Sequence, residues 1–310
     1  MKSSRRIARL AAPLLLLAFL LPGCSRAEAQ KQQEAQAAPA PAPTEGKPLV
    51  RTVRLSVRVV GNGEDARLEV PLVQSDEHQT LLAEKLLSRG FQVEEAMREG
   101  NRLAILTWPK LKGAKRITYE FTVALRPLSV EVPPAPVSTG DPSPEDEPWL
   151  RSTRNLQSTS PLIREKLIHF ATPRLARGEK DAIRIAWDLT DTYERKPEGS
   201  KTVLKATRTG HAADRGLDRL FATFLRTSGI PARPVQGVDV LRKRRRFTTW
   251  VEVKSGGDWL PMSVPRDQWG KLPARFVKLS HGDRPLIVRR GVEKISFRWK
   301  VTKPAAEASR

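Results

Sequence analysis

The body of this chain falls into two stretches that differ in how apolar and polar positions repeat. Over residues 50–130, apolar and polar residues alternate in runs such as TVRLSVRVV, NRLAILTW and KRITYEFTVAL. Alternation with a period of two is typical of strands that bury one face, so these residues predict a β-rich, sandwich-like N-terminal domain. One interruption, residues 77–87, lacks this alternation and is predicted to be a helix.

The second stretch, residues 149–303, changes its period partway along. Apolar residues first recur at helical spacing and later alternate, which indicates helices followed by an antiparallel sheet. This order is typical of an α+β domain in which a helix packs on the sheet. The predicted helices cover residues 161–171, 179–193 and 213–226, and the predicted strands cover residues 233–240, 247–254, 258–263, 285–289 and 294–301.

Segments of biased composition mark the boundaries of these domains. Residues 131–148 contain six prolines, which exclude a central strand or helix and predict a linker. Residues 24–49 are mainly Ala, Gln and Pro, with little to bury, and predict a flexible tether. Residues 304–310 are predicted to be a tail.

The N-terminus has the composition of a secretion signal. Residues 1–23 place four cations before an apolar run that is too short to span a bilayer. The Leu-Pro-Gly-Cys that follows resembles the bacterial lipobox, which implies that Cys24 is diacylated and becomes the mature N-terminus. The protein would then be exported and lipid-anchored to a bacterial membrane, facing the periplasm. The alternative is cleavage after Ala29, which would release a secreted or soluble periplasmic protein.

Cysteine content and charge narrow the possible chemistry. Cys24 is the only cysteine among 310 residues, so no disulfide can form within the chain and the folded body has no thiol nucleophile. Without residues 1–23 the chain keeps 51 basic and 34 acidic side chains, a net charge of +17. Such an excess attracts polyanions. Outside the cytoplasm we expect these to be anionic lipids or polymers rather than nucleic acid.

Five consecutive cations lie between two of the predicted strands. They are Arg242, Lys243, Arg244, Arg245 and Arg246. Such a run is often a solvated hairpin tip, but in a basic exported protein it also predicts a loop that binds phosphate groups.

Other common chemical motifs are missing from the sequence. It contains no Gly-x-Gly-x-x-Gly, no phosphate-binding loop and no aromatic-basic RNA signature, and its four histidines are scattered without the spacing of metal ligands. We therefore expect no metal and no cofactor.

A more specific pattern begins at the third predicted helix. Its apolar residues occupy one stripe, and Gly229 ends it. The chain continues with Gly-Ile-Pro-Ala-Arg, then Thr-Thr-Trp-Val-Glu-Val and Gly-Asp-Trp-Leu-Pro-Met-Ser. Together these segments resemble the transglutaminase-like superfamily, which is related to papain. In that family a cysteine at the start of the helix attacks an acyl carbon, a histidine on the next strand accepts the proton, and an aspartate on the third orients the imidazole.

Carried over by position, the resemblance places the cysteine at Asp214, the histidine at Thr248 and the aspartate at Ser263. The implied triad has therefore lost its thiol, its imidazole and its orienting carboxylate. Because a hydroxyl is no base near neutral pH, we expect no acyl transfer by the family's route. Another arrangement stays open, in which His211 and Asp214 activate Ser263 as a nucleophile, although a histidine just before a helix is more often a cap or loop residue.

The resemblance extends to one branch of the family. Residues 265–287 look like the corresponding segment of bacterial inactive transglutaminase domains that are fused to seven membrane helices, with a similar Leu-Pro, Leu and Gly-Asp run. The sequence contains no such seven-helix region, so the resemblance concerns the inactive domain.

These observations predict an exported lipoprotein whose inactive transglutaminase-like domain is a binding or scaffold module in the cell envelope. Its partner would be a protein or peptide, and the former cleft would include Trp250 and His211. Two alternatives stay open. One is a hydrolase or acyltransferase with an atypical nucleophile, and the other is a structural envelope component that works through the β-rich domain.

Overall fold

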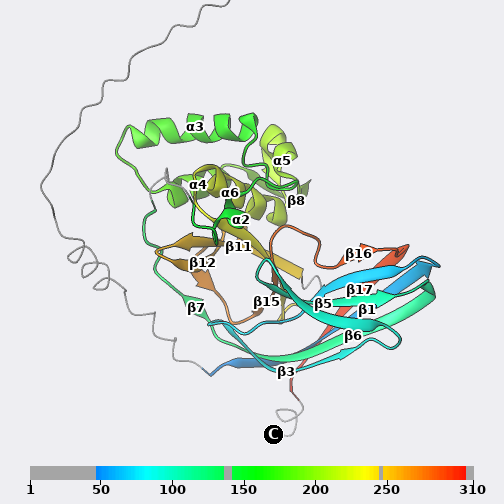
Figure 1. The fold of residues 1–310 in the computed structure, drawn as a ribbon. Coiled ribbons are helices and arrows are strands. Elements are labelled where there is room, and N and C mark those ends of the chain that lie inside the picture. The colour runs from blue at the N-terminus through cyan, green and yellow to red at the C-terminus, as the bar shows by residue number, and fades with distance from the viewer. Residues whose placement is uncertain (1–46, 136–141, 244–246, 305–310) are drawn as a thin grey trace, which may run out of the picture. The chain divides into compact units, whose positions relative to one another are not determined.

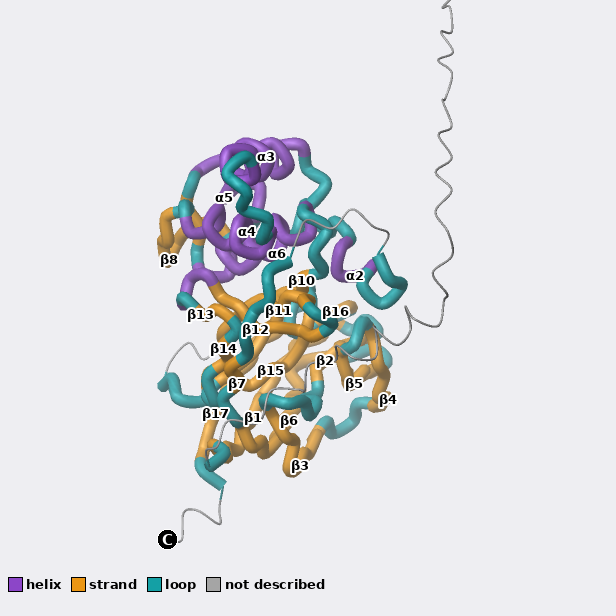
Figure 2. Tube along the Cα trace, turned by 90° about the vertical axis from the view of Figure 1, so that its left-hand side faces the viewer, coloured by secondary structure: helices purple, strands orange, loops and turns teal. Residues whose placement is uncertain are grey.

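The computed structural model describes residues 47–135, 142–243 and 247–304, which belong to one compact unit (Figure 1). The helices gather in one half and most strands in the other (Figure 2). Among these residues, no helix has the length and apolar character needed to cross a membrane. The sheets are almost all antiparallel and the helices few, which confirms the predicted α+β class. The predicted signal peptide, and most of the predicted tether and tail, lie outside the described residues.

Two four-stranded antiparallel sheets form a β-sandwich. Sheet A has the order β17 (Lys294–Thr302), β1 (Leu49–Asn62), β6 (Lys112–Leu125) and β3 (Gln79–Leu87). Sheet B has the order β16 (Val288–Arg290), β2 (Ala66–Pro71), β5 (Asn101–Trp108) and β4 (Gln92–Arg98). Alternate residues point inward, and both sheets contribute to one core, with Leu55 and Phe121 from sheet A and Leu68 and Leu106 from sheet B among its members. The predicted sandwich-like domain is confirmed.

Strand β3 corrects the predicted helix at residues 77–87. Its sequence, QTLLAEKLL, favours a helix locally, yet it pairs with β6 along its length, with an irregularity between Leu81 and Ala83. On its inner side, Glu84 accepts a 2.8 Å hydrogen bond from the Tyr119 hydroxyl and pairs with Arg102 at 2.6 Å. Pairing with a long, half-buried strand outweighs the propensity of a short helix that would be marginal on its own.

The last strands lie outside the domain to which the sequence pattern assigned them. The predicted second domain includes residues 294–301, but the structure adds these residues to sheet A as β17, with Trp299 opposite Leu55. Strand β16 likewise extends sheet B beside β2. Because Ile295, Trp299 and Val301 pack against the sandwich core, the C-terminal strands complete the N-terminal domain.

The described part of the other half contains five α-helices and a five-stranded central sheet. The helices are α2 (Glu147–Leu150), α3 (Pro161–Leu175), α4 (Ala182–Asp191), α5 (Val203–Thr209) and α6 (Asp214–Thr227). The central sheet has the order β13 (Gln268–Trp269), β12 (Asp258–Ser263), β11 (Phe247–Ser255), β10 (Ala232–Asp239) and β15 (Phe276–His281). Shorter elements are the pairs β8 (Glu194–Ser200) with β9 (His211–Ala212) and β7 (Leu128–Ser129) with β14 (Lys271–Leu272), and the 3-10 turn η1 (Val264–Arg266).

Helix α6 is the element that the sequence predicted best. Its apolar stripe is buried, and the chain turns away at Gly229, which has a φ of 77°. Near its start, Gly216 packs so closely on the end of β8 that a Cβ atom there would lie 2.1 Å from the carbonyl oxygen of Ser200. The N-terminal turn of α6 is thereby held against its neighbours.

The central sheet separates two hydrophobic cores. Val251 and Val253 belong to the core that also contains the apolar residues of α4 and α6. Val238 and Val277 instead join the core of the sandwich. The predicted linker is partly ordered against this half, because the amide of Ala182 donates to a carbonyl at residue 135, 2.7 Å away, and Lys254 Nζ donates to Asp146 Oδ1 at 2.6 Å. The two predicted domains therefore share packed surfaces instead of hanging on a flexible connection.

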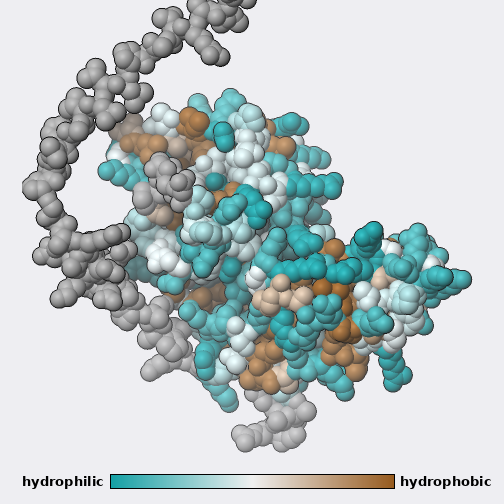
Figure 3. All heavy atoms as spheres, viewed as in Figure 1, coloured by the Kyte–Doolittle hydropathy of each residue, from teal (hydrophilic) through white to brown (hydrophobic). Residues whose placement is uncertain are grey.

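The surface includes exposed apolar side chains on both halves, and Figure 3 shows brown areas near the top and over the strand-rich lower part. Exposed apolar residues are common on soluble proteins, so they do not indicate a binding surface by themselves. The larger ones are Leu82, Leu87, Val93, Met97, Ile168, Leu175, Leu241 and Phe297.

Candidate functional site

The three positions implied by the family resemblance lie at the ends of a helix and two strands. Asp214 is the first residue of α6, Thr248 is the second residue of β11, and Ser263 is the last residue of β12. The antiparallel pairing of β11 with β12 brings Thr248 and Ser263 to the same end of the central sheet. Both of these hydroxyl side chains are buried.

Arg266, on η1, bridges two of these positions. Its Nη2 donates to Thr248 Oγ1 at 2.6 Å, and its Nη1 donates to Ser263 Oγ at 2.8 Å. Nη1 also donates to the backbone carbonyl of Thr249. A guanidinium group therefore joins the two positions to which the family resemblance assigned the histidine and the aspartate. The sequence reasoning did not identify Arg266, which lies three residues beyond Ser263.

A second residue that the sequence reasoning missed, Asp218, completes this cluster. It lies one turn into α6 and is buried. Thr249 Oγ1 donates to its Oδ2 at 2.6 Å, Ser263 Oγ donates to its Oδ1 at 3.0 Å, and Arg266 Nη1 lies 3.9 Å from Oδ2. We call Asp218, Thr248, Thr249, Ser263 and Arg266 the buried polar cluster.

Burial dominates the electrostatics of Asp218. Removal from water raises the pKa of its carboxyl, whereas Arg266 and the two hydroxyl donors lower it, and the pKa ends at about 6. At pH 7 the carboxylate is therefore mostly ionised and faces a guanidinium. Its two oxygens already accept hydrogen bonds from Thr249 and Ser263. The cluster thus ties α6 to β11 and β12.

Asp214 is held apart from this cluster by a different partner. Both of its carboxylate oxygens accept hydrogen bonds from Arg195 on β8, from Nε at 2.6 Å and from Nη2 at 2.9 Å. Both side chains are largely exposed, at 42% for Asp214 and 56% for Arg195. The structure therefore brings together two of the three implied positions, Thr248 and Ser263, and turns the third toward solvent.

The alternative constellation around His211 is not assembled. The Nδ1 atom of His211 lies 3.0 Å from the carbonyl oxygen of Thr209, the last residue of α5. Ser263 has no exposed surface and bonds to Asp218 and Arg266 instead. A histidine that contacts the end of α5 and a serine that is buried inside the domain do not form a base and nucleophile pair.

Trp250 belongs to the core instead of a cleft. Only 1% of it is exposed, and it packs with Val235, Leu272 and Phe276. Its ring stacks on Phe276 with the centroids 6.1 Å apart. Since residues alternate along β11, Trp250 points to the face opposite Val251 and α6. The prediction that it lines an open cleft is therefore wrong.

The remaining predicted sites lie at or beyond the edge of the described residues. The side chain of Arg242 is 63% exposed, and its Nε lies 3.8 Å from Asp239, whose carboxylate is also bound by Arg275. Lys243 is exposed. Arg244, Arg245 and Arg246 lie outside the described residues, as does Cys24, so the phosphate-binding loop and the lipidation site stay predictions.

A buried ionic network on β10, β11 and β15 was not anticipated. Arg233 and Glu252 lie directly opposite each other, and Arg233 donates to Glu252 from Nε at 2.8 Å. Lys278 Nζ donates to the other oxygen of Glu252 at 2.7 Å, and His281 Nε2 lies 3.6 Å from Glu252. The guanidinium of Arg233 also stacks on Trp259, 3.9 Å from the ring centroid. One member of the network, Arg233, is the last residue of the Gly-Ile-Pro-Ala-Arg motif, so the sequence analysis had already singled out its segment.

This network lowers the pKa values of Glu252 and His281, for different reasons. Burial raises the pKa of Glu252, but Lys278 and Arg233 outweigh it and bring the pKa down to about 2. Burial lowers the pKa of His281 to about 4, so its imidazole is neutral at pH 7. A carboxylate held by two cations inside the fold is typical of a structural ion cluster.

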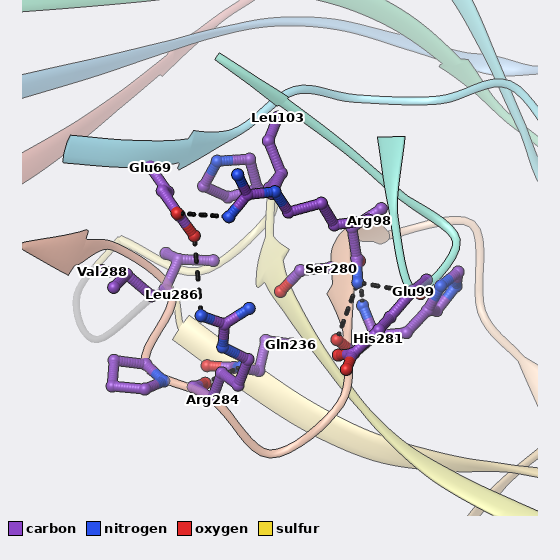
Figure 4. A pocket seen from close by; sticks show the side chains of 13 residues that line it. Glu69, Arg98, Glu99, Leu103, Gln236, Ser280, His281, Arg284, Leu286 and Val288 are labelled. Carbon is purple, nitrogen blue, oxygen red and sulfur yellow. Dashed lines mark hydrogen bonds and ion pairs between the residues drawn. The ribbon is translucent and has the colours of Figure 1, made fainter. Parts of the chain in front are cut away.

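A small pocket borders this network where sheet B meets the central sheet (Figure 4). Arg98 and Arg284 converge there on Glu69, at 2.7 and 3.6 Å, beside Ser280 and His281. Glu69 Oε2, Ser280 Oγ and both ring nitrogens of His281 have no hydrogen-bond partner in the described protein atoms. The pocket encloses only about 30 Å³, which suits one or a few ordered waters better than a substrate.

Within the described residues, including this pocket, no three His, Cys, Asp or Glu side chains are placed to hold a metal ion.

Comparison with protein families identifies the segment around this cluster. Residues 174–264, which contain α4, α5, α6 and strands β10 to β12, match the model of the transglutaminase-like superfamily. This segment is therefore transglutaminase-like, as its sequence motifs indicated. No curated protein matches the chain.

One solved structure extends the likeness in fold beyond that segment. A crystal structure named a putative cysteine protease from Cytophaga hutchinsonii superimposes with a TM-score of 0.64 and 16% identity, over 84% of this chain and 92% of the other. A putative protease from Parabacteroides distasonis matches with a TM-score of 0.27 and 10% identity, over 69% of this chain and 64% of the other. The first match shows that the sandwich and the transglutaminase-like half occur together in a known fold.

Proposed function

We propose that this protein is an exported lipoprotein whose transglutaminase-like domain is catalytically inactive and acts as a binding or scaffold module in the cell envelope. The observation that carries this proposal is the buried polar cluster, in which Arg266 joins Thr248 and Ser263. An active site of this family would need a thiol, an imidazole and an orienting carboxylate at the corresponding positions.

The chemistry of the cluster supports the inactive assignment. The described residues contain no cysteine, and a thiolate is the nucleophile of the family's mechanism. The hydroxyls of Thr249 and Ser263 donate to a carboxylate with no open path to solvent, because all three side chains are buried. A general base must reach the proton of a bound substrate. Asp218 reaches only groups of its own domain.

A binding role follows from what the scaffold retains. The helix-on-sheet arrangement is intact, and the start of α6 stays accessible at the exposed Asp214–Arg195 pair. The Cytophaga hutchinsonii protein with the same fold is named a putative cysteine protease, which supports a peptide or protein as the partner of this scaffold. Loss of the reactive groups removes turnover but leaves such a surface available.

An assay of the purified protein tests the inactive assignment. Neither amine transfer to glutaminyl peptides nor peptide hydrolysis should exceed the rate in buffer. Turnover that disappears in Ser263→Ala or Thr249→Ala would instead establish an enzyme with an atypical nucleophile. The variant Glu120→Gln is the matched control, because its side chain belongs to an exposed pair on β6 of the sandwich and lies outside the cluster.

Metabolic labelling tests the proposed location. Cells that express the full chain are grown with radiolabelled palmitate, and the same is done for Cys24→Ser. Label should appear in the wild-type protein, in the membrane fraction, and be absent from the variant. An unlabelled soluble protein whose N-terminus follows Ala29 would establish the alternative cleavage and exclude the lipid anchor.

A further inference from the structure

One side of the β-sandwich carries charge of almost a single sign. Directly opposite residues in neighbouring strands point to the same side of a sheet. In β1, Val53, Leu55 and Val57 point into the core, so the residues between them point outward together with their partners on β17, β6 and β3. We call this outward side of sheet A the basic face. Its cations are Arg54, Arg58, Lys85, Arg116, Lys294, Arg298 and Lys300.

Few acids offset these cations. Glu120 is the one carboxylate on the basic face within the described strands, and it accepts a 2.6 Å hydrogen bond from Arg54. Glu84, next to Lys85 in sequence, points to the opposite side and pairs with Arg102. All seven cations are exposed. The other outward positions include the hydroxyl residues Thr52, Ser56, Thr118, Thr122, Ser296 and Thr302, together with small or apolar residues such as Val60, Ala114 and Leu87.

The opposite sheet shows that this bias is not a general property of the sandwich. The outward side of sheet B mixes both signs, because Glu69 and Glu94 share it with Arg67, Arg98 and Arg290. Glu69 there pairs with Arg98 at 2.7 Å. Without residues 1–23 the whole chain has 51 basic and 34 acidic side chains. The ratio of basic to acidic side chains is therefore much higher on the basic face, with seven cations and one carboxylate, than over the whole chain.

The shape of the basic face selects among possible anionic partners. Its cations are spread over four adjacent strands, which lie about 4.8 Å apart. The outward positions of the paired strands include no aromatic residue that could stack on a base. A two-dimensional array of cations and hydroxyls can contact many headgroup phosphates of a bilayer at once, whereas a single extended polymer would follow one row.

We propose that the basic face docks the sandwich onto an anionic lipid bilayer. This inference assigns a surface and a partner that the inactive transglutaminase-like domain does not require, and it holds with or without acylation of Cys24. Among the described residues, Arg54 is the one cation of the basic face that forms an ion pair, with Glu120. The other six cations therefore each contribute attraction to anionic headgroups. That attraction is worth roughly a fivefold gain in partitioning per cation.

The test measures binding to vesicles. The chain from residue 25 onward keeps every described residue and cannot be lipidated at Cys24. Its partitioning is measured by co-sedimentation with vesicles of neutral lipid, with and without about 30 mol% anionic phospholipid. The variant Arg54→Gln, Arg58→Gln, Arg116→Gln and Arg298→Gln should bind anionic vesicles at least a hundredfold more weakly, and wild-type binding should fall steeply with added salt.

A second variant controls for net charge. Arg164→Gln, Lys166→Gln, Lys205→Gln and Arg208→Gln removes the same charge from exposed positions on α3 and α5. It should lose much less binding than the first variant, with circular dichroism showing that both are folded. Equal losses would overturn the proposal, because net charge alone would then explain binding. Stronger binding to soluble polyphosphate than to vesicles would also overturn it, in favour of a polymer partner.

Discussion

Asp218 and Arg266 show how two side chains connect the positions that the family resemblance implies for the histidine and the aspartate. The Asp218 carboxylate accepts hydrogen bonds from two hydroxyls, and the Arg266 guanidinium donates to Thr248 and Ser263. Buried polar groups cost free energy unless they are bonded to one another. The cluster satisfies this requirement internally and therefore acts as a structural connection between α6 and the central sheet.

Replacement of Asp218 by Asn should change how stability depends on pH. The pKa of Asp218 is about 6 in the folded protein and 3.8 as a free side chain, so the folded state binds the proton more tightly. Its contribution is fully present below pH 4 and lost as the pH rises through 6, by about 3 kcal/mol. Asn does not titrate. The free energy of unfolding of Asp218→Asn should therefore rise relative to wild type by about that amount between pH 4 and pH 7 in urea denaturation.

The control for this prediction is Asp214→Asn, at the exposed pair with Arg195. Its effect should stay within about 1 kcal/mol and show no comparable change over the same pH interval. The same pH response in both variants would show that Asp218 has no special role.

Glu252→Gln tests the ionic network beside the pocket. The variant leaves Lys278 and Arg233 without their shared anion, so it should lower the free energy of unfolding by about 3–5 kcal/mol at pH 7. The pKa of Glu252 is lowered from 4.5 to about 2, so its stabilisation is present above pH 4.5 and lost as the pH falls toward 2. The difference from wild type should narrow from pH 5 to pH 3. Glu120→Gln, at an exposed pair, should show no such loss at pH 7.

At the scale of elements, α6 determines the position of the cluster. Its apolar stripe packs into the helical core, while Asp218 on the same helix reaches β11 and β12. The close approach at Gly216 sets the depth of the helix relative to the end of β8. The transglutaminase-like arrangement therefore depends on backbone contacts as well as on the residues of the cluster.

Gly216→Ala should destabilise the protein although it improves helix propensity. In an open helix this change gains about 1 kcal/mol. Here the new Cβ would lie 2.1 Å from the carbonyl oxygen of Ser200, so α6 must shift. We expect the melting temperature to fall by several degrees, about 4 °C or more, in differential scanning calorimetry. An unchanged or higher melting temperature would show that the end of β8 can move to make room for the new Cβ atom with no loss of stability.

At the scale of the molecule, the two halves share one folded body. The central sheet presents Val251 and Val253 to one core and Val238 and Val277 to the other. Strand β17 returns from the C-terminal end of the chain to pair with β1. Neither half therefore contains all of its own core.

Removal of the second half should unfold the first. A protein of residues 47–148 would lose β16, β17 and the residues of β10 and β15 that pack into the sandwich core. We expect it to show poorly dispersed NMR amide resonances and rapid proteolysis, whereas residues 47–304 should give a dispersed spectrum. A stable, dispersed 47–148 would revive the alternative that the β-rich domain works as an independent structural module.

Motifs with a local physical cause were predictable from the sequence. The stripe of α6, its end at Gly229 and the Gly-Ile-Pro-Ala-Arg turn follow from spacing and from backbone freedom at glycine. They were enough to indicate the α+β class and the transglutaminase-like resemblance. Strand β3 shows the limit of local rules, because pairing with β6 overrode its preference for a helix.

The sequence by itself determined the amino acids available at the triad positions and the absence of a thiol from the folded body. Only the tertiary structure decided that Arg266 joins Thr248 and Ser263, that Asp214 turns to Arg195, and that β17 completes both the sandwich and its basic face. The physical reason is distance along the chain. Spacing rules describe neighbours within one helix or strand, whereas these contacts join residues from separate elements whose approach is set by burial of the two cores.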